Sequence, residues 1–329
     1  MRPFAYVNAA NEKEAIAALG PDRGKFLPLA GGTDLLALIK DYIAMPERLV
    51  NVKNLDGRIV KQADGGLKIG AAVTVDDLAN DPDVRRLYPA LVTAAEDVGT
   101  PQIRHAGTIG GNLNQRPRCW YFRNEEFECL KKGGSRCFAV DGENQYHAIF
   151  GDGPCHMIHP SSLAVPAVAL GARFRVAGPA GEREVTAADY FVMPARDVFG
   201  ETVLRPNELM THMILPAPGN TRTATYEVRS RQSHDWPLAT ATVVLDMNGT
   251  TVRAARVVMG AVAPIPWRSP AAEAVLAGKA ITEYIAMGAA DAAVENATAM
   301  TQNGHKLQIA RTAVKRAIIQ AAGLAANWV

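Results

Sequence analysis

The stretch Ala30-Gly31-Gly32-Thr33-Asp34 follows a short apolar run at 25–29 and precedes a helical run at 35–43. Two adjacent glycines let the chain turn sharply and bring several main-chain N–H groups close to a ligand, and the start of a helix favours negative charge. The pattern therefore indicates an anion-binding turn that fits a pyrophosphate. It lacks the GxGxxG spacing of a Rossmann turn and the GKS or GKT of a Walker loop, so an ordinary tight turn is the alternative.

A second glycine-rich turn, Ala106-Gly107-Thr108-Ile109-Gly110-Gly111-Asn112-Leu113, follows an apolar helix predicted at 87–98. Its glycines also permit close approach of the main chain to a ligand. Two such turns can hold one diphosphate from opposite sides.

Directly after the second turn, the segment 114–160 contains all four cysteines of the chain, Cys119, Cys129, Cys137 and Cys155. It is rich in glycine and has no sustained helical or strand period, so we expect irregular backbone. Loops of this length inside a compact domain are functional or disordered. The seven Trp, Tyr and Phe residues of the segment argue against disorder. Four thiolates around a metal centre can fold such a loop.

The cysteines are separated by ten, eight and eighteen positions and form no CxxC pair. This spacing weakens the case for a zinc ribbon and favours a [4Fe-4S] cluster, which takes four cysteine ligands at varied spacing. Structural zinc, disulfides and unrelated thiols are the alternatives. His147, His156 and His159 lie nearby as substitute ligands, although loop histidines are more often hydrogen-bonding residues.

Composition excludes several classes of protein. The chain has 329 residues, 48% hydrophobic and 21% charged, and a net charge of +2, which suits two globular domains. No basic stripe with interleaved aromatic residues is present, so nucleic acid is not expected as a partner. We expect no membrane span and a cytoplasmic location, because 1–11 lacks the features of a signal peptide and no window holds eighteen apolar residues. A partner's signal peptide would carry the assembly to the periplasm.

Two sequences of capping-box type predict helix starts, at Asn11 with Glu14 and at Thr74 with Asp77. In the C-terminal part, three strands are expected at 222–229, 238–247 and 252–262, with Asn248-Gly249 as a hairpin signal. Three alanine-rich helices follow.

The two turns together resemble the paired FAD signature of the flavoprotein subunits of molybdenum hydroxylases, the xanthine dehydrogenase and carbon monoxide dehydrogenase family. The resemblance spans nearly the whole chain and includes 226–241, 260–263 and 266–268 of the C-terminal part. It implies an α+β fold with a two-part FAD-binding domain of the PCMH and vanillyl-alcohol-oxidase type at 1–218, with subdomains at about 1–55 and 56–218. A smaller C-terminal domain, a three-stranded antiparallel sheet with helices, is expected at 219–329.

Most members pass from the second turn directly to a Ser-Asp helix cap, whereas this chain inserts the cysteine loop. The insertion is similar to two subgroups that hold a [4Fe-4S] cluster there: the FAD subunit of bacterial aldehyde oxidoreductases and the beta subunit of 4-hydroxybenzoyl-CoA reductase. The Arg118-Cys119 start, the cysteine spacing and Lys306-Leu307 look closer to the aldehyde oxidoreductases. The resemblance therefore implies that all four cysteines bind the cluster.

The resemblance also implies which residues contact FAD. Residues 28–35 wrap the pyrophosphate with main-chain amides, and Thr33 adds a hydroxyl donor. Ser162 departs from the family, which usually has Asp there, so this contact loses its charge. Met210 is expected to cover the flavin ring and Arg229 to lie beside it, and the ordinary alternatives for the two are core packing and surface pairing. The implied set is Pro28, Leu29, Ala30, Gly31, Gly32, Thr33, Asp34, Leu35, Val98, Gly99, Gly107, Thr108, Gly111, Asn112, Ser161, Ser162, Met210 and Arg229.

The family's chemistry belongs to its cofactors. The resemblance implies an oxidoreductase subunit with no catalytic residue in this chain. A partner subunit with molybdopterin oxidises the substrate, a small subunit with two [2Fe-2S] clusters passes the electrons to FAD, and an external acceptor receives them. An aldehyde oxidoreductase is expected, with subunits like those of 4-hydroxybenzoyl-CoA reductase or xanthine dehydrogenase as alternatives. A non-enzymatic zinc scaffold and a self-sufficient flavin oxidoreductase are the competing classes.

Overall fold

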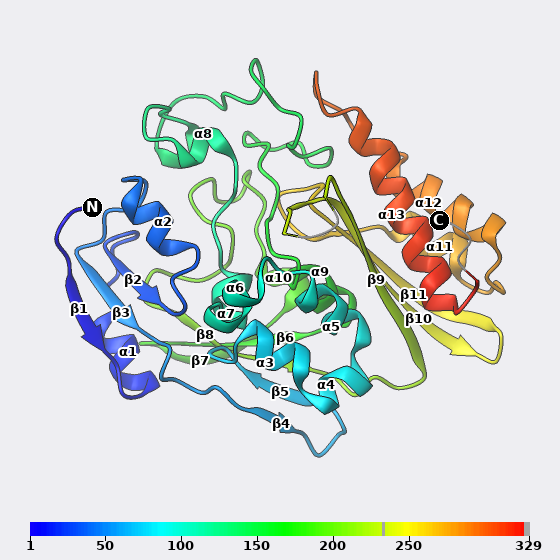
Figure 1. Cartoon of the computed structure of the whole chain (residues 1–329), viewed down its shortest axis with the longest axis horizontal. Coiled ribbons are helices and arrows are strands. Elements are labelled where there is room, and N and C mark those ends of the chain that lie inside the picture. Colours follow the sequence, from blue (N-terminus) through cyan, green and yellow to red (C-terminus); the bar gives the residue numbers. More distant parts are fainter. Residues whose placement is uncertain (232–233, 326–329) are drawn as a thin grey trace.

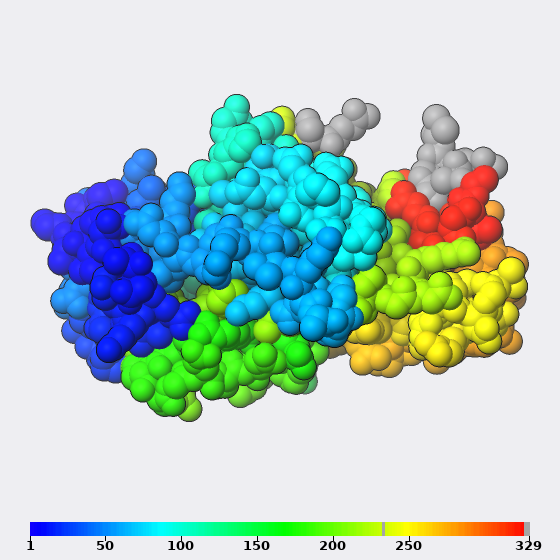
Figure 2. Space-filling model, turned by 90° about the horizontal axis from the view of Figure 1, so that it is seen from below, coloured from blue at the N-terminus to red at the C-terminus, as the bar shows by residue number. Residues whose placement is uncertain are grey.

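The part of the chain that the structure describes forms three sheets, which follow one another along the long axis of the molecule (Figure 1). The computed structural model describes residues 1–231 and 234–325. Seen from below, the N-terminal part and the C-terminal helices occupy opposite ends (Figure 2). None of the helices in these described ranges is long and apolar enough to cross a membrane.

The N-terminal sheet has three parallel strands in the order β1-β3-β2. Asn11 caps the first helix as predicted: the Glu14 amide donates to Asn11 Oδ1 at 2.9 Å, and the Glu14 carboxylate accepts from the Ala10 amide. The elements are β1 (Ala5–Asn8), α1 (Glu12–Ala18), β2 (Phe26–Leu29), α2 (Leu35–Lys40) and β3 (Arg48–Asn51).

The middle sheet has five antiparallel strands in the order β4-β5-β8-β6-β7. Helices bury one face of it, with Leu67, Ile69, Leu78, Leu91 and Phe174 in the shared core. The strands are β4 (Ile59–Lys61), β5 (Leu67–Gly70), β6 (Arg173–Gly178), β7 (Gly181–Thr186) and β8 (Leu209–Leu215), and the helices are α3 (Val75–Asn80), α4 (Pro82–Leu87), α5 (Pro89–Glu96), α6 (Pro101–Ala106), α7 (Ile109–Leu113), α9 (Ala164–Ala169) and α10 (Ala187–Tyr190).

The C-terminal sheet is antiparallel in the order β12-β11-β10-β9. The prediction of three strands is wrong, because a fourth strand of two residues pairs with β11 at Val258 and Met259. A strand that short shows no sequence period. The predicted hairpin at Asn248-Gly249 is confirmed, with Gly249 at φ +61. The elements are β9 (Thr221–Arg229), β10 (Pro237–Asn248), β11 (Thr251–Gly260), β12 (Trp267–Arg268), α11 (Pro270–Leu276), α12 (Glu283–Val294) and α13 (His305–Ala322).

The cysteine segment leaves the end of α7 and is irregular, as expected, apart from α8 (Trp120–Arg123) and a 3₁₀ turn, η1 (Leu130–Lys132). In Figure 1 it arches over the upper side of the molecule between α2 and the C-terminal helices. Its second half is fastened to the C-terminal part, since the amides of Ile149 and Phe150 both donate to the Val262 carbonyl. The segment therefore bridges the sheets rather than extending one of them.

Candidate functional site

The two glycine-rich turns lie directly against each other. A Cβ atom built on Gly31 would stand 1.8 Å from the Ala106 carbonyl oxygen, a contact that no other residue can make. Gly32 has φ +72, in the left-handed region that favours glycine. A Cβ on Gly107 would lie 3.5 Å from the Thr33 hydroxyl. The first turn thus needs both of its glycines, one for space and one for conformation.

The second turn is held in place by its own cap and by the chain ahead of α3. Thr108 Oγ1 accepts from the Gly111 amide at 3.1 Å, and the Ile109 amide donates to the Val73 carbonyl at 2.9 Å. The predicted cap at Thr74 is also confirmed, with the Asp77 amide donating to its hydroxyl. These bonds set the main chain of the second turn opposite the first.

Between the N-terminal and middle sheets lies a cavity of about 980 Å³. Both turns line it, and Met210, which is buried on β8, forms part of its wall. The cavity has the size of a cofactor site, and residues of both glycine turns form part of its lining. The residues expected at FAD that line it are Pro28, Ala30, Gly31, Gly32, Thr33, Asp34, Leu35, Gly107, Thr108, Gly111 and Met210.

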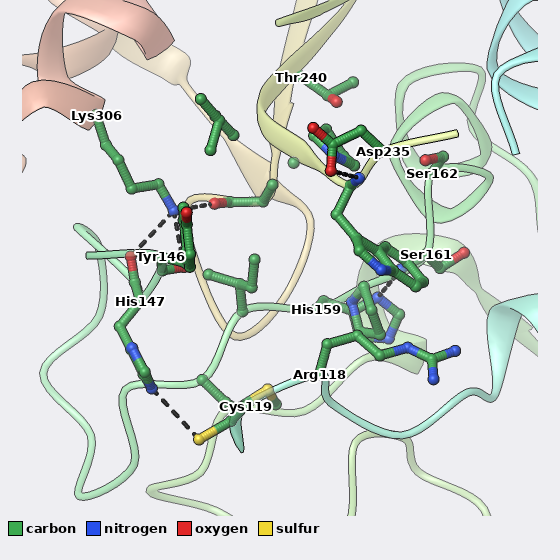
Figure 3. A pocket seen from close by; sticks show the side chains of 18 of the residues that line it. Arg118, Cys119, Tyr146, His147, His159, Ser161, Ser162, Asp235, Thr240 and Lys306 are labelled. Atoms are coloured by element: carbon green, nitrogen blue, oxygen red, sulfur yellow. Dashed lines mark hydrogen bonds between the residues drawn. The ribbon is translucent and has the colours of Figure 1, made fainter. Parts of the chain in front are cut away.

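A second cavity, of about 290 Å³, lies between the cysteine segment and the C-terminal sheet. Ser161 and Ser162 line it, and Figure 3 shows them on the side away from Cys119 and His147. Ser161 Oγ donates to Asn112 Oδ1 at 2.6 Å, so Asn112 connects the second turn to this cavity. The structure thus divides the expected FAD contacts between two neighbouring cavities.

The other expected contacts lie outside the two cavity linings. Leu29 ends β2 immediately before the first turn. Arg104 donates to the carbonyls of Val98 and Gly99, and Arg229 donates to Asp97 Oδ1 at 2.5 Å. Arg229 and the 98–99 stretch are therefore brought together through Asp97, from opposite sides of the junction between the middle and C-terminal sheets.

The side chain of Asp34 is taken up by the cysteine segment. Its carboxylate accepts from the Arg116 amide at 2.9 Å, from Arg118 at 2.8 Å and from Arg123 at 2.6 Å. Asp34 and Arg123 are largely buried, with side chains 16% and 15% exposed. The family resemblance implies that Asp34 contacts FAD, and in the structure its carboxylate links the first glycine turn to the base of the cysteine segment.

All four cysteines line one narrow cavity, together with Phe122, Leu130, Lys131, Phe138, His147 and Met157. We call these four cysteines the cysteine cage. They come from separate places in the segment: Cys119 precedes α8, Cys129 precedes η1, and the other two lie in loops. None of them is in a disulfide.

The thiols differ in their electrostatic surroundings. Burial raises the pKa of Cys119 to about 11, against the opposing effect of the Phe122 and Tyr121 amides. A hydrogen bond from the Cys155 thiol lowers the pKa of Cys137, and the same bond raises the pKa of Cys155. Main-chain amides, including that of His156, further lower the pKa of Cys137. Such N–H groups aimed at sulfur are a general means of tuning iron–sulfur ligands.

Among the described residues, no three His, Cys, Asp or Glu side chains stand as ligands of one metal ion. A single zinc ion would need three or four such side chains to meet at one point. A [4Fe-4S] cluster is different, because each thiolate binds its own iron and the ligands surround the cluster instead of meeting at one point. Four free thiols around one cavity are the donor set that such a cluster requires.

Two buried lysines that sequence analysis did not assign hold the segment around the cage. Lys131 Nζ lies 2.7 Å from Glu201 and donates to the Val198 carbonyl. Lys306, at the start of α13, is fully buried and donates to the carbonyls of Tyr146, His147 and Ala261. Burial lowers the pKa of Lys306 to about 7. No local sequence signal reveals these roles, since both depend on distant carbonyls.

Comparison with known proteins agrees with this geometry. Residues 2–218 match the family described as FAD binding domain in molybdopterin dehydrogenase, and residues 224–321 match the CO dehydrogenase flavoprotein C-terminal domain. This chain belongs to the FAD-binding subunits of molybdenum hydroxylases. It is accordingly a flavoprotein subunit of an oxidoreductase, and FAD is its cofactor.

The flavoprotein subunit is 34% identical to the aldehyde oxidoreductase FAD-binding subunit PaoB of Escherichia coli (strain K12), over 98% of this chain and 99% of that protein. It is 29% identical to the carbon monoxide dehydrogenase medium chain of Hydrogenophaga pseudoflava, over 88% of this chain and 86% of that protein. The agreement therefore extends over both domains.

Solved structures agree in fold. The chain superposes on quinoline 2-oxidoreductase from Pseudomonas putida 86 with a TM-score of 0.75 and 26% identity, covering 98% of each chain. It superposes on carbon monoxide dehydrogenase from Hydrogenophaga pseudoflava with a TM-score of 0.76 and 28% identity, again over 98% of each chain. The expected two-domain α+β architecture of the flavoprotein subunit is thus confirmed, apart from the number of C-terminal strands.

Proposed function

We propose that this chain is the FAD- and [4Fe-4S]-carrying electron-transfer subunit of a heterotrimeric aldehyde oxidoreductase. Its partners are a molybdopterin-binding large subunit, which oxidises the aldehyde, and a small subunit with two [2Fe-2S] clusters. Electrons reach the FAD of this chain and leave to an external acceptor. The assembly is cytoplasmic unless a partner carries it to the periplasm.

One observation carries the proposal: four cysteines spread over thirty-seven positions of the sequence line a single cavity. The aldehyde substrate is supported by the similarity to an aldehyde oxidoreductase FAD-binding subunit over 98% of the chain. The cysteine segment begins directly after the second glycine turn, so FAD and the [4Fe-4S] cluster would be neighbours. The matched ranges support a boundary between the two domains near residue 219.

When bound, FAD would take up electrons in pairs, and the cluster would carry them one at a time. Side chains cannot supply this chemistry. The chain's own residues position the two groups. Residues 30–33 of the first turn and Thr108, Gly110 and Gly111 of the second line the large cavity, where they would hold the diphosphate. The amides of 109–111 are already paired within the protein, so the amides available for the diphosphate would come from the first turn. The four thiols line the narrow cavity, and the aromatic rings of Tyr121, Phe127 and Phe138 pack together beside it.

The two cofactors can be tested separately in anaerobically purified protein. Iron, sulfide, zinc and flavin are measured for the wild type, for Cys129→Ser and for Gly31→Val, and the reduced proteins are examined by EPR. We expect four irons and one FAD in the wild type. Cys129→Ser loses iron and keeps FAD, whereas Gly31→Val loses FAD and keeps iron.

Zinc in place of iron in the wild type would contradict the cluster, and so would an unchanged EPR signal in Cys129→Ser. The aldehyde substrate is tested on the complex purified with its partners, by reduction of the bound flavin with aromatic and aliphatic aldehydes. Reduction by purines but by no aldehyde would overturn that part of the proposal.

A further inference from the structure

The outer surface of the cysteine segment contains a groove of about 540 Å³. Four aromatic rings line it, those of Trp120, Tyr121, Phe127 and Phe138. The rings support one another, since Phe127 meets both Tyr121 and Phe138 edge to face with ring centres 5.1 Å apart. The Tyr121 hydroxyl accepts from the Glu143 amide at 2.7 Å, which fixes one wall. The groove is thus a preformed apolar surface of the kind that binds other proteins.

The groove lies directly beside the cysteine cage. Tyr121 and Phe138 line both the groove and the narrow cavity that the four cysteines share. A molecule seated in the groove would therefore be separated from the cage by a single layer of side chains. No other part of the segment needs to move to bring the two together.

The charges of the cysteine segment are balanced in the sequence but separated in the structure. Residues 114–160 contain six acidic and six basic side chains. Four of the basic side chains form ion pairs of 2.6 to 2.8 Å with Asp34 or Glu201, two acids from outside the segment; they are Arg116, Arg118, Arg123 and Lys131. Most of the positive charge is therefore neutralised on the inner side of the segment.

The acidic side chains of the segment remain on the outside. All six are exposed, and none forms an ion pair within the described part of the chain. Asp141 and Glu143 line the groove. Three more, Glu125, Glu126 and Glu128, are next to groove-lining residues in the sequence. We call the groove and these five carboxylates the acidic groove.

Two basic residues of the segment offset part of this charge. Arg136 lines the groove and lies over the Phe138 ring, 4.6 Å from its centre. Lys132 Nζ donates to the Asn124 carbonyl, and Asn124 also lines the groove. Five carboxylates against two cations leave an excess of three negative charges around an apolar floor. A partner with the opposite charge is therefore favoured there, and an acidic partner is repelled.

We propose that the acidic groove docks a small one-electron carrier protein whose docking face is basic. The inference rests on the proposed function, because this carrier is the external acceptor to which the electrons leave. One electron passes from the reduced flavoprotein subunit to the oxidised metal centre of the carrier, and no covalent bond forms or breaks. The carboxylates speed the encounter and select a basic partner, while the aromatic floor provides the apolar contact.

Binding is tested first, with a basic c-type cytochrome as the probe and an acidic [2Fe-2S] ferredoxin for comparison. Dissociation constants are measured by calorimetry at low ionic strength, for the full-length chain and for its complex with the partner subunits. We expect Asp141→Asn combined with Glu143→Gln to raise the Kd of the cytochrome about fivefold or more. Arg136→Gln should lower it about twofold, and salt of about 0.5 M should remove both differences.

Electron transfer is tested next. The chain is reduced anaerobically with dithionite and mixed with oxidised cytochrome in a stopped-flow instrument. We expect the second-order rate constant to fall in the double variant by about the same factor as the affinity. The rate with a small uncharged quinone should not change, since a quinone needs no docking charge.

A second double variant is the matched control. Asp64→Asn combined with Glu295→Gln removes the same amount of charge from two other exposed acids, one in the turn between β4 and β5 and one after α12. Neither residue lines the groove. Cytochrome affinity and the electron-transfer rate should stay at the wild-type values.

Four results would overturn the proposal. An unchanged Kd in the groove variant would remove the carboxylates from the docking face, and an equal loss in the control would reduce the effect to net charge. Tighter binding of the ferredoxin than of the cytochrome would reverse the charge of the partner. Binding to the chain but not to the complex would assign the groove to a partner subunit.

Failure of the proposed function is recognised separately. Wild-type chain that lacks iron or FAD would contradict the cofactors of the proposed function. The Kd of the cytochrome does not require either cofactor, so the docking measurement stands apart from that result.

Discussion

The glycine turns form their site with the main chain, whereas the cysteine cage forms its site with side chains. At the turns, the main chain faces the cavity, and side chains are excluded because a Cβ on Gly31 would overlap the Ala106 carbonyl. At the cage, four side chains face the cavity from irregular backbone, and the shape of that backbone is set by distant contacts such as Lys306 with Tyr146 and His147.

The difference matters for how each site tolerates change. A main-chain site on strand–turn–helix units depends on local conformation, so single glycines control it. A side-chain site on a long loop depends on whatever fastens the loop, so residues far from the site control it. Asp34 lies in the first glycine turn and also pairs with the cysteine segment. Substitution of Asp34 therefore tests whether the two sites are independent.

Gly31→Val should have the largest effect. The new side chain overlaps the Ala106 carbonyl and forces the two turns apart, so we expect FAD affinity to fall by about 100-fold or more. Titration of FAD-free protein by flavin fluorescence measures this. Gly133→Val is the matched control, since its surroundings within 4 Å are open, although φ +93 strains it and predicts lower stability. Comparable FAD loss in both variants would refute the close contact as the cause.

Asp34→Asn should disturb both sites at once. It removes the charge that pairs with Arg118 and Arg123 in a largely buried setting, and breaking such a pair costs about 3–4 kcal/mol. We expect lower FAD affinity together with lower iron content. If FAD affinity falls while iron content stays at the wild-type level, the turn and the cage are independent.

Lys306→Met should affect the cage and spare the turns. It removes the donor of the buried Ala261 carbonyl and of the partly buried Tyr146 carbonyl and one of the two donors of the His147 carbonyl, at a cost of about 2 kcal/mol. Chemical denaturation measures the loss of stability, and iron analysis measures the cage. Lys279→Met, at an exposed position, is the control. Reduced FAD affinity with normal iron content would contradict this expectation, because it would mean that Lys306 supports the glycine turns and not the cysteine cage.

Glu227→Gln should have the smallest effect, visible in the pH dependence of stability. Burial, followed by the charge of Asp97, raises the folded-state pKa of Glu227 to about 7, above the unfolded value, so the protonated acid stabilises the fold at low pH and this contribution is lost as pH rises through 7. Between pH 6 and 8, FAD-free wild type should lose about 1 kcal/mol more than Glu227→Gln. Urea denaturation at both pH values measures the difference, and equal losses would contradict the raised pKa.

Much of this protein was accessible from the sequence because the signals are local. Two glycine turns between strands and helices, the caps at Asn11 and Thr74, and the hairpin at Asn248-Gly249 each depend on residues a few positions apart. The irregular backbone of 114–160 followed from its glycines and lack of period. The strand β12 was missed because two residues carry no period.

What only the tertiary structure decided depends on long-range packing. Four cysteines line one cavity, Asp34 pairs with the cysteine segment, and Lys306 holds Tyr146 and His147, and these contacts join residues up to 160 positions apart. Glu227 shows no sequence signal at all, since its burial arises only when β9 packs against the middle part. Burial and pairing of side chains are properties of the assembled fold, whereas turns and caps are properties of the local chain.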